Sequence, residues 1–287
     1  MLLERFHSVT TNNYSFIISH LRNEMMKIVL RIFDLIKYRN SDMFNDVNIE
    51  TTSFCNRRCD NCPNSIFNRS LQKNEKLLAE ELFKKIIDDL KSIKFTGRIS
   101  PHSFNEPLLD KRLVRLMKYA HNALPKAKLV IYTNGDFLDI IIMNDLYKAG
   151  VKSYVITLYG THNEIEKNEK RMFDLKKYIK EKKMNISLEI NNFSSRSNLS
   201  NRGGLINVKN ISKTLACQSF TNPLVVNCEG DVILCCNDYL GQETFGNVEK
   251  ESLLNIWNSE RFKIIRKDVR NDLFNLNICK KCTANRN

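Results

Sequence analysis

The nine cysteines are the residues of this 287-residue sequence with the most specific chemistry, and they fall into two groups. Three of them, Cys55, Cys59 and Cys62, lie within eight residues, directly after a predicted strand. Three thiolates at this spacing can hold three irons of a 4Fe–4S cluster and leave the fourth iron without a protein ligand. An open metal position is typical of a reactive centre. Zinc sites favour two pairs of ligands, of which Cys-x3-Cys-x2-Cys is a poor half.

The second group lies in the last quarter of the chain. Cys217 and Cys235 flank a predicted hairpin, and Cys279 and Cys282 form a Cys-x2-Cys pair near the end. Four thiolates suit a fully ligated iron–sulfur cluster or a structural zinc equally well. Coordination chemistry alone leaves both readings open.

Composition narrows the class of protein. With 45 Lys and Arg against 32 Asp and Glu, the formal net charge is +13. The lysines are spread along predicted helices rather than gathered in one arm, so no nucleic-acid partner is expected. With only 9 glycines the sequence contains neither G-x-G-x-x-G nor a Walker A loop. No secretory signal or membrane-spanning stretch is visible, which predicts a cytoplasmic protein whose thiols stay reduced.

Predicted strands and helices alternate from residue 46 onward. Strands are expected at Val47–Phe54, Arg98–Ser103, Lys128–Thr133, Ser153–Leu158 and Ile186–Ile190. Helices are expected at Asn74–Ile93, Lys111–Leu124, Ile140–Ala149 and Asn163–Lys183. This alternation predicts an α/β fold with parallel strands. About 160 residues are too few for a complete eight-unit barrel, which takes ~250, so the expected fold is a partial (β/α)6 TIM-type barrel with its active site at the carboxyl ends of the strands.

The chain divides into three predicted parts: an N-terminal helical extension (1–44), the partial barrel (45–205) and a small C-terminal domain (206–287). Apolar residues at helical spacing between Ser15 and Tyr38 predict a helix that packs on the barrel. The alternative is an amphipathic helix in peripheral contact with a membrane.

The C-terminal domain is predicted to contain a β-hairpin and a helix. Leu224–Asn227 and Val232–Cys236 form the hairpin strands, joined through Gly230. Ser252–Arg270 is predicted to be one amphipathic helix, which carries the single tryptophan, Trp257.

The three-cysteine loop after the first strand resembles that of the radical S-adenosylmethionine (SAM) superfamily, and the resemblance covers about residues 46–283. The segment Asn105–Leu109 is similar to the family's "GGEPLL" element and Thr133–Gly135 to its "TNG" element. The resemblance implies a 4Fe–4S cluster that reductively cleaves SAM to a 5′-deoxyadenosyl radical, which abstracts hydrogen from the substrate. It also implies a set of SAM-contacting residues, with Glu106 accepting from the SAM ammonium: Asn105, Glu106, Thr133, Asn134 and Thr157.

The C-terminal cysteines resemble the SPASM/twitch appendage of the same superfamily. By that resemblance a second, auxiliary 4Fe–4S cluster is held by Cys217, Cys235, Cys279 and Cys282. The segment Ser200–Gly204 resembles an "NRAG" element of this subgroup. Arg202 is therefore predicted to clamp substrate oxygens or assist deprotonation, with a structural role in the loop as the alternative.

The resemblance implies a radical oxidoreductase, and the cyclitol dehydrogenases of the family suggest its reaction. The expected substrate is a secondary alcohol of a sugar, a cyclitol or a nucleotide-linked sugar, and the expected electron donor is an acidic protein such as flavodoxin or ferredoxin. One alternative is a redox-neutral epimerase in which Cys228 or Cys236 returns hydrogen to the substrate; otherwise these two thiols only pack. The others are a peptide-modifying maturase and a zinc-binding nucleic-acid module.

Overall fold

The computed structural model describes residues 42–193, 200–207, 217, 223–271 and 273–283, together with the isolated positions 25, 28, 29, 32 and 36. Its centre is one open eight-stranded sheet with the order β5-β4-β3-β2-β1-β6-β7-β8. The strands are β1 (Asp46–Ile49), β2 (Arg98–Ser100), β3 (Lys128–Thr133), β4 (Ser153–Leu158), β5 (Ser187–Asn192), β6 (Pro223–Val226), β7 (Asp231–Ile233) and β8 (Thr244–Asn247).

Strands β1 to β5 are parallel, as the alternating pattern predicts. The sixth parallel strand, β6, comes from the C-terminal cysteine-rich region and pairs with β1 from Asp46 opposite Pro223 to Ile49 opposite Val226. Strands β7 and β8 then continue the same sheet in antiparallel pairing. The C-terminal region is therefore an extension of the barrel sheet at its β1 edge.

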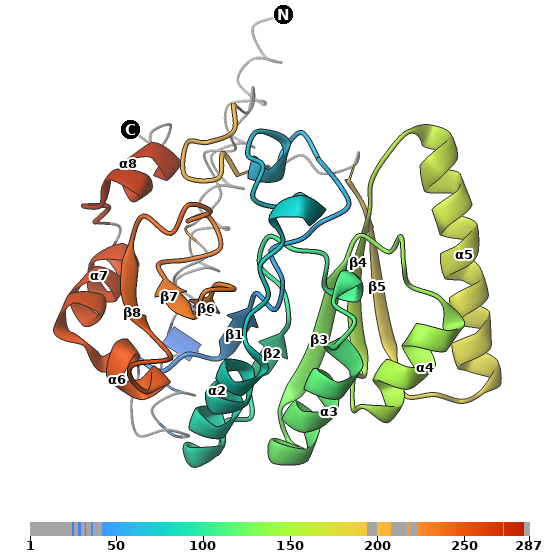
Figure 1. The fold of residues 1–287 in the computed structure, drawn as a ribbon, viewed down its shortest axis with the longest axis horizontal. Helices are drawn as coiled ribbons and strands as arrows, with labels where there is room; N and C mark the ends of the chain where they lie inside the picture. Colours follow the sequence, from blue (N-terminus) through green and yellow to red (C-terminus); the bar gives the residue numbers. More distant parts are fainter. Residues whose placement is uncertain are drawn as a thin grey trace, which may run out of the picture.

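Four helices cover one face of the parallel strands (Figure 1): α2 (Glu80–Ser92), α3 (Leu113–Ala123), α4 (Ile140–Lys148) and α5 (His162–Glu181). Their apolar stripes form the main core with alternate residues of the strands, such as Val47, Ile131 and Tyr154. Along β4 burial alternates strictly, so Val155 and Thr157 lie on the face that these helices leave open. The open face meets the long loop after β1, which contains the short 3-10 helices at Pro63–Ser65 and Gln72–Asn74; a third, Pro107–Leu109, follows β2.

The predicted single helix over Ser252–Arg270 is wrong, because it is two helices, α6 (Leu253–Asn258) and α7 (Glu260–Arg270). Ser259 ends the first and begins the second with an extended backbone (φ −58°, ψ 142°). Serine is favoured before a helix start. The break lets Trp257 pack edge-on against both Phe44 and Phe262 in the core. The last helix, α8 (Asn277–Thr283), carries the Cys-x2-Cys pair.

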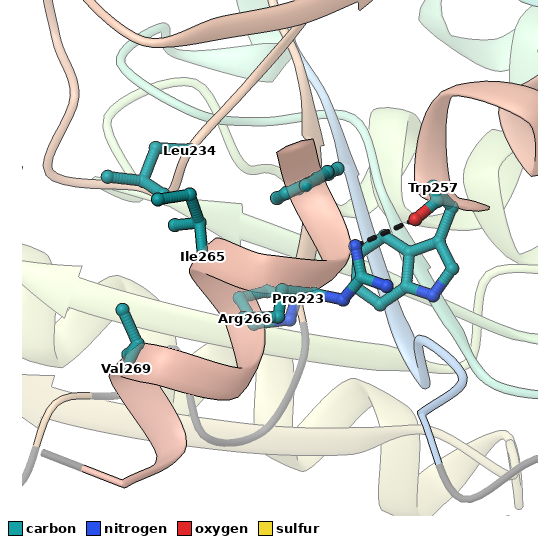
Figure 2. A pocket seen from close by; sticks show the side chains of 7 residues that line it. Pro223, Leu234, Trp257, Ile265, Arg266 and Val269 are labelled. Carbon is teal, nitrogen blue, oxygen red and sulfur yellow. Dashed lines mark hydrogen bonds between the residues drawn. The ribbon is translucent and has the colours of Figure 1, made fainter. Parts of the chain in front are cut away.

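Arg266 of α7 connects the C-terminal helices to the residues just before β1 through hydrogen bonds and an ion pair. Its guanidinium lies 3.7 Å from the ring centre of Trp257 and donates to the Trp257 carbonyl at 2.8 Å (Figure 2). It also donates to both carboxylate oxygens of Asp42, at 2.6 and 3.3 Å, while the Trp257 indole donates to the Asp42 carbonyl at 2.7 Å. Arg270 forms a second ion pair with Asp42. We call Asp42, Trp257, Arg266 and Arg270 the anchor.

The predicted helix over Ser15–Tyr38 lies almost entirely outside the described residues, so its packing on the barrel stays a prediction. Five of its positions are described, and they are helical and exposed. Among the residues that the structure describes, no helix combines the length and apolarity that crossing a bilayer requires.

Candidate functional site

The three-cysteine loop leaves the carboxyl end of β1 and lies at the top of the sheet in Figure 1. Backbone bonds shape the loop, from the Cys55 amide to the Ser70 carbonyl at 3.2 Å and from the Cys62 amide to the Cys59 carbonyl at 2.9 Å. The three thiols are free and partly exposed. Burial is the main reason that the pKa of Cys55 rises to about 12 and that of Cys59 to about 11, and the charges of neighbouring thiols and carboxylates contribute to both rises.

The chemistry of these donors fits an iron–sulfur cluster. Three free sulfur ligands lie close enough on one loop to shift each other's pKa, and iron in such clusters is bound by thiolates. Within the described residues, no group of three His, Cys, Asp or Glu side chains is already arranged to hold a metal ion. Ligation by Cys55, Cys59 and Cys62 therefore stays a prediction.

Glu106 is held at the adjoining strand ends by three donors. It accepts from the Thr133 hydroxyl at 2.7 Å and from the backbone amides of Asn134 at 2.8 Å and Leu108 at 3.1 Å. The carboxylate is only 2% exposed. Burial raises its pKa to about 7, although these hydrogen bonds act in the opposite direction. A buried carboxylate with this pKa is suited to receive a cation, because a positive partner favours its ionised form.

Two residues that the sequence analysis did not single out join the cysteine loop to the end of β3. Asp136 accepts two bonds from Arg57, both at 2.6 Å, and one from Asn56 at 2.7 Å. Asn134 donates to Asn56 at 2.8 Å. Arg57 lies between two cysteines of the cysteine motif and Asp136 directly follows Thr133–Gly135, but the two residues are 79 positions apart, so only their spatial contact reveals this brace.

Two further residues predicted to contact SAM are Asn105, which is buried in a loop, and Thr157, which lies on a strand. Asn105 is buried, and its amide bonds the loop itself, accepting from the Ser103 amide at 2.9 Å and donating to the Pro101 carbonyl at 3.2 Å. It thus shapes the turn in which the family has glycine. Thr157 lies on the open face of β4, opposite Asn191 of β5.

The C-terminal thiols come together at α8, which carries two of them. Cys217, Cys235 and Cys279 pack in one small cluster. Asn237 donates from its backbone amide to the sulfur of Cys235 at 3.4 Å and from its side chain to the sulfur of Cys282 at 3.8 Å. Amide donors to sulfur are also the contacts that tune iron–sulfur clusters. The four-thiol set fits an auxiliary cluster in ligand type and number, and its ligation stays a prediction.

Arg202 lies where the barrel meets these thiols. Its backbone has a left-handed φ of 52°, held by its amide bonding Ser200 Oγ at 3.1 Å, and its guanidinium donates to Asn237 Oδ1 at 3.4 Å. The next residue, Gly203, also has a positive φ, and a Cβ there would come within 2.8 Å of Ile278 in α8. A non-glycine residue kept in this conformation is costly and typical of functional sites. The positive charge of Arg202 reaches Cys236, whose pKa burial raises.

Cys228 lies apart from Arg202, at the end of β6. It lines a cavity of about 280 Å³ between the cysteine loop and the hairpin, with Arg69, Phe104 and Tyr239. Arg69 donates to the Cys228 sulfur at 3.7 Å and forms an ion pair with the fully buried Glu50. We call the ion pair of Glu50 and Arg69 the rim pair, and Cys228 is the thiol beside it.

Comparison with known proteins agrees with this geometry. The radical SAM superfamily model matches residues 49–193, and the SPASM iron–sulfur cluster-binding domain model matches residues 217–283. The S-adenosyl-L-methionine-dependent 2-deoxy-scyllo-inosamine dehydrogenase of Niallia circulans is 31% identical over 244 residues, which cover 84% of this chain and 93% of that protein.

Two solved structures have a fold similar to that of this chain. The crystal structure of BtrN in complex with AdoMet and 2-DOIA has a TM-score of 0.72 and 30% identity, covering 84% of this chain and 93% of that one. Streptococcus suis SuiB bound to its precursor peptide SuiA has a TM-score of 0.59 at 15% identity, covering 82% and 70%. The second likeness concerns the fold alone.

Proposed function

The chain belongs to the radical SAM superfamily, and on that premise we propose that it oxidises a secondary alcohol of a cyclitol or a related sugar to the ketone. The observation that supports this most is the match to 2-deoxy-scyllo-inosamine dehydrogenase over 93% of that protein. The match of residues 217–283 to the SPASM domain model supports it as well. The chain is thus a radical SAM oxidoreductase that uses SAM, a 4Fe–4S cluster and an auxiliary iron–sulfur cluster.

Cys55, Cys59 and Cys62 would hold the SAM-binding cluster, which together with SAM supplies a radical able to remove a hydrogen atom from an unactivated C–H bond. Glu106 receives the SAM ammonium. Its two oxygens are fixed by Thr133 and Asn134, so the carboxylate needs no reorientation when the cation arrives. A charge-assisted hydrogen bond of this kind is the strong type.

The brace between Asp136 and Arg57 keeps the cysteine loop at a constant distance from Glu106. Both ends of the brace are charged and paired through two bonds, a geometry that also restricts rotation. The loop and the SAM-binding carboxylate therefore move as one unit, which a reaction between a cluster and its ligand requires.

Arg202 orients the substrate. Its guanidinium offers donors only, so it binds the oxygen lone pairs of hydroxyl groups. Asn237 contacts Arg202 as well as the sulfurs of Cys235 and Cys282, which links the substrate position to the auxiliary thiols. The thiols of Cys217, Cys235, Cys279 and Cys282 would hold the cluster that takes the electron left after hydrogen removal. The +13 charge suits an acidic electron donor such as flavodoxin or ferredoxin.

The test is anaerobic turnover of the reconstituted, reduced enzyme with SAM and 2-deoxy-scyllo-inosamine or related cyclitols. We expect ketone and 5′-deoxyadenosine in equal amounts, with deuterium moving from a labelled carbinol carbon into 5′-deoxyadenosine. Cys235→Ala is expected to keep 5′-deoxyadenosine formation and lose the ketone. Abundant 5′-deoxyadenosine with deuterium transfer but no ketone from the wild type contradicts the proposal.

One observation keeps the epimerase as a second candidate. Cys236 lies close enough to Arg202 for the guanidinium charge to act on its thiol. A thiol that can donate a hydrogen atom is therefore near the residue proposed to bind the substrate. Turnover in heavy water distinguishes the two reactions. Deuterium at the reacting carbon of an inverted product, lost in Cys236→Ser but kept in Cys228→Ser, would favour the epimerase.

A further inference from the structure

His102 is a half-buried histidine, and the proposed function assigns it no role. It follows β2 by two residues and precedes Glu106 by four, so it lies at the carboxyl end of the strand on the open face of the sheet. Its ring stacks on Tyr132 of β3, with ring centres 4.3 Å apart and planes 17° apart. Stacking on one side and a hydrogen bond on the other fix the orientation of the imidazole.

The hydrogen bonds determine which ring nitrogen carries the proton. Ser100 donates its hydroxyl hydrogen to Asn48 Oδ1 at 2.6 Å. The Ser100 oxygen is 3.1 Å from His102 Nδ1, and because its hydrogen is already committed it can only accept there. Nδ1 therefore carries the hydrogen, and the lone pair of the neutral ring is on Nε2. No side chain in the described part of the chain bonds Nε2 in return.

The charges around His102 keep it neutral. Burial, together with the guanidinium groups of Arg98 and Arg202, lowers its pKa to about 3. Arg98 is paired with Asp46, whereas Arg202 comes from the junction with the auxiliary thiols. Arg202, 100 residues further along the chain, is thus close enough for its charge to act on the His102 ring. A guanidinium donates only and a neutral Nε2 accepts only, so together they match the two hydrogen-bonding sides of one hydroxyl group.

We propose that His102 Nε2 binds the hydroxyl hydrogen of the alcohol being oxidised and accepts it as a proton during the reaction. This inference rests on the proposed function. Oxidation of the alcohol removes one hydrogen atom from carbon, one proton from oxygen and one electron, which passes to the auxiliary iron–sulfur cofactor. The O–H bond breaks, the carbonyl bond forms, and the new N–H bond is on His102.

A weakly basic imidazole suits this task. Once the electron has left, the remaining protonated carbonyl is a far stronger acid than imidazolium, so even a base weakened by two guanidinium groups accepts its proton. The same weak basicity returns the proton to solvent afterwards, which restores the acceptor for the next turnover. Ser100 and Asn48 are positioning residues, because they act through the ring.

The test compares His102→Gln with the matched control His121→Gln, whose residue lies on α3 and packs beside Gly150 on the helix-covered side. Glutamine keeps a hydrogen-bond acceptor but cannot take a proton. In His102→Gln we expect 5′-deoxyadenosine formation and deuterium transfer from labelled substrate to persist, while ketone formed per 5′-deoxyadenosine falls about 100-fold, the usual size of a lost general base. His121→Gln is expected to keep the wild-type ratio.

Four outcomes overturn the inference. An unchanged ratio in His102→Gln removes His102 from the proton transfer, and an equal loss of ketone and 5′-deoxyadenosine makes its role structural. If His102→Gln does not fold, Ser100→Ala serves instead. It must lower the same ratio, because it releases Nδ1, and an unchanged ratio there also overturns the inference. A wild type that transfers deuterium without forming ketone overturns the proposed function together with this inference.

Discussion

The C-terminal region contacts the barrel at both ends of β1, and a charged pair is buried at each end. The two pairs differ in how completely their polar atoms are hydrogen-bonded. At the anchor, each guanidinium nitrogen of Arg266 donates to Asp42 or to the Trp257 carbonyl. At the rim pair, Glu50 is fully buried, yet one of its oxygens has no hydrogen-bond partner, and one Arg69 nitrogen is equally unpartnered among the described residues. The anchor is at the start of β1 and the rim pair at its end.

This difference separates stability from function along one strand. A buried charge costs free energy unless it is fully paired, so natural structures leave it incomplete mainly where something else is bound. The cysteines, Glu106 and the cavity by Cys228 all lie at the rim end. We therefore expect substitutions at the anchor to lower the free energy of unfolding most, and those at the rim end to lower it less and to affect the chemistry of the site.

The largest expected effect is at the cysteine loop. Cys59→Ala is expected to reduce 5′-deoxyadenosine formation below detection, because two thiolates cannot hold the cluster that binds SAM. The thermal unfolding of the iron-free protein should match that of the iron-free wild type. Iron content and 5′-deoxyadenosine are measured in the same anaerobic preparation. Undiminished SAM cleavage in Cys59→Ala would contradict the assignment of the cluster to this loop.

Asp42→Asn is the matching change at the anchor. It leaves Arg266 buried without a counter-charge, which costs about 3–5 kcal/mol of unfolding free energy. Burial raises the pKa of Asp42, but its bonds and charge interactions with Arg266 and Arg270 outweigh this and hold the pKa below its usual value. The stabilisation is thus complete above about pH 4 and is lost as pH falls through the lowered pKa.

Urea denaturation of the wild type and Asp42→Asn at pH 7 and pH 3 tests this prediction. The difference between their free energies of unfolding should shrink at the lower pH. Activity per folded molecule should stay within about twofold of wild type at a temperature where both are folded. A difference in unfolding free energy that persists undiminished at pH 3 would contradict the ionic origin of the stabilisation. An activity that falls with no loss of stability would instead place a functional role at the anchor.

Glu106→Gln has a smaller effect and tests the SAM contact. Loss of one charge-assisted hydrogen bond, about 1.5–3 kcal/mol, weakens SAM binding roughly 10- to 100-fold. Because the pKa of Glu106 is raised to about 7, the folded protein without SAM keeps a proton on Glu106 that the unfolded chain loses. This residue therefore lowers the free energy of unfolding as pH rises from about 4.5 to 7. Calorimetry at pH 6 should show proton release on SAM binding to the wild type, and none from this position in Glu106→Gln.

Glu50→Gln is expected to have the smallest effect. It removes the counter-charge of Arg69, but the Arg69 side chain is 27% exposed and borders a cavity that admits water. We expect a loss of about 1–2 kcal/mol, less than at Asp42, because water partly replaces the lost partner. Urea denaturation of Glu50→Gln and Asp42→Asn side by side decides the order, and a larger loss at Glu50 would reverse it.

Much of the candidate site is readable from local spacing. Cys55, Cys59 and Cys62 are near each other in space because they are near in sequence, and Glu106 and Thr133 each follow a strand that can be recognised by its apolar run. Parallel neighbours bring such strand ends to one edge of the sheet, so the contact between Glu106 and Thr133 follows from the alternation of strands and helices.

Other features depend on contacts between distant segments. The pairing of β6 with β1 joins residues almost 180 positions apart, and no local pattern selects that edge of the sheet. The break at Ser259 is favoured by its residue type, but the packing of Trp257 against Phe44 and Phe262 is what requires it. The brace between Arg57 and Asp136 also has no signal in the spacing of either residue.

The sequence by itself thus determined the kind of chemistry, because iron–sulfur ligation depends on how many thiols a short segment carries. Only the tertiary structure decided where a substrate would meet it, since Arg202 and His102 are 100 residues apart in the sequence and act on one another through space. Their charges and the tautomer of the imidazole depend on neighbours such as Ser100 and Asn48, whose contacts exist only after the strands have paired.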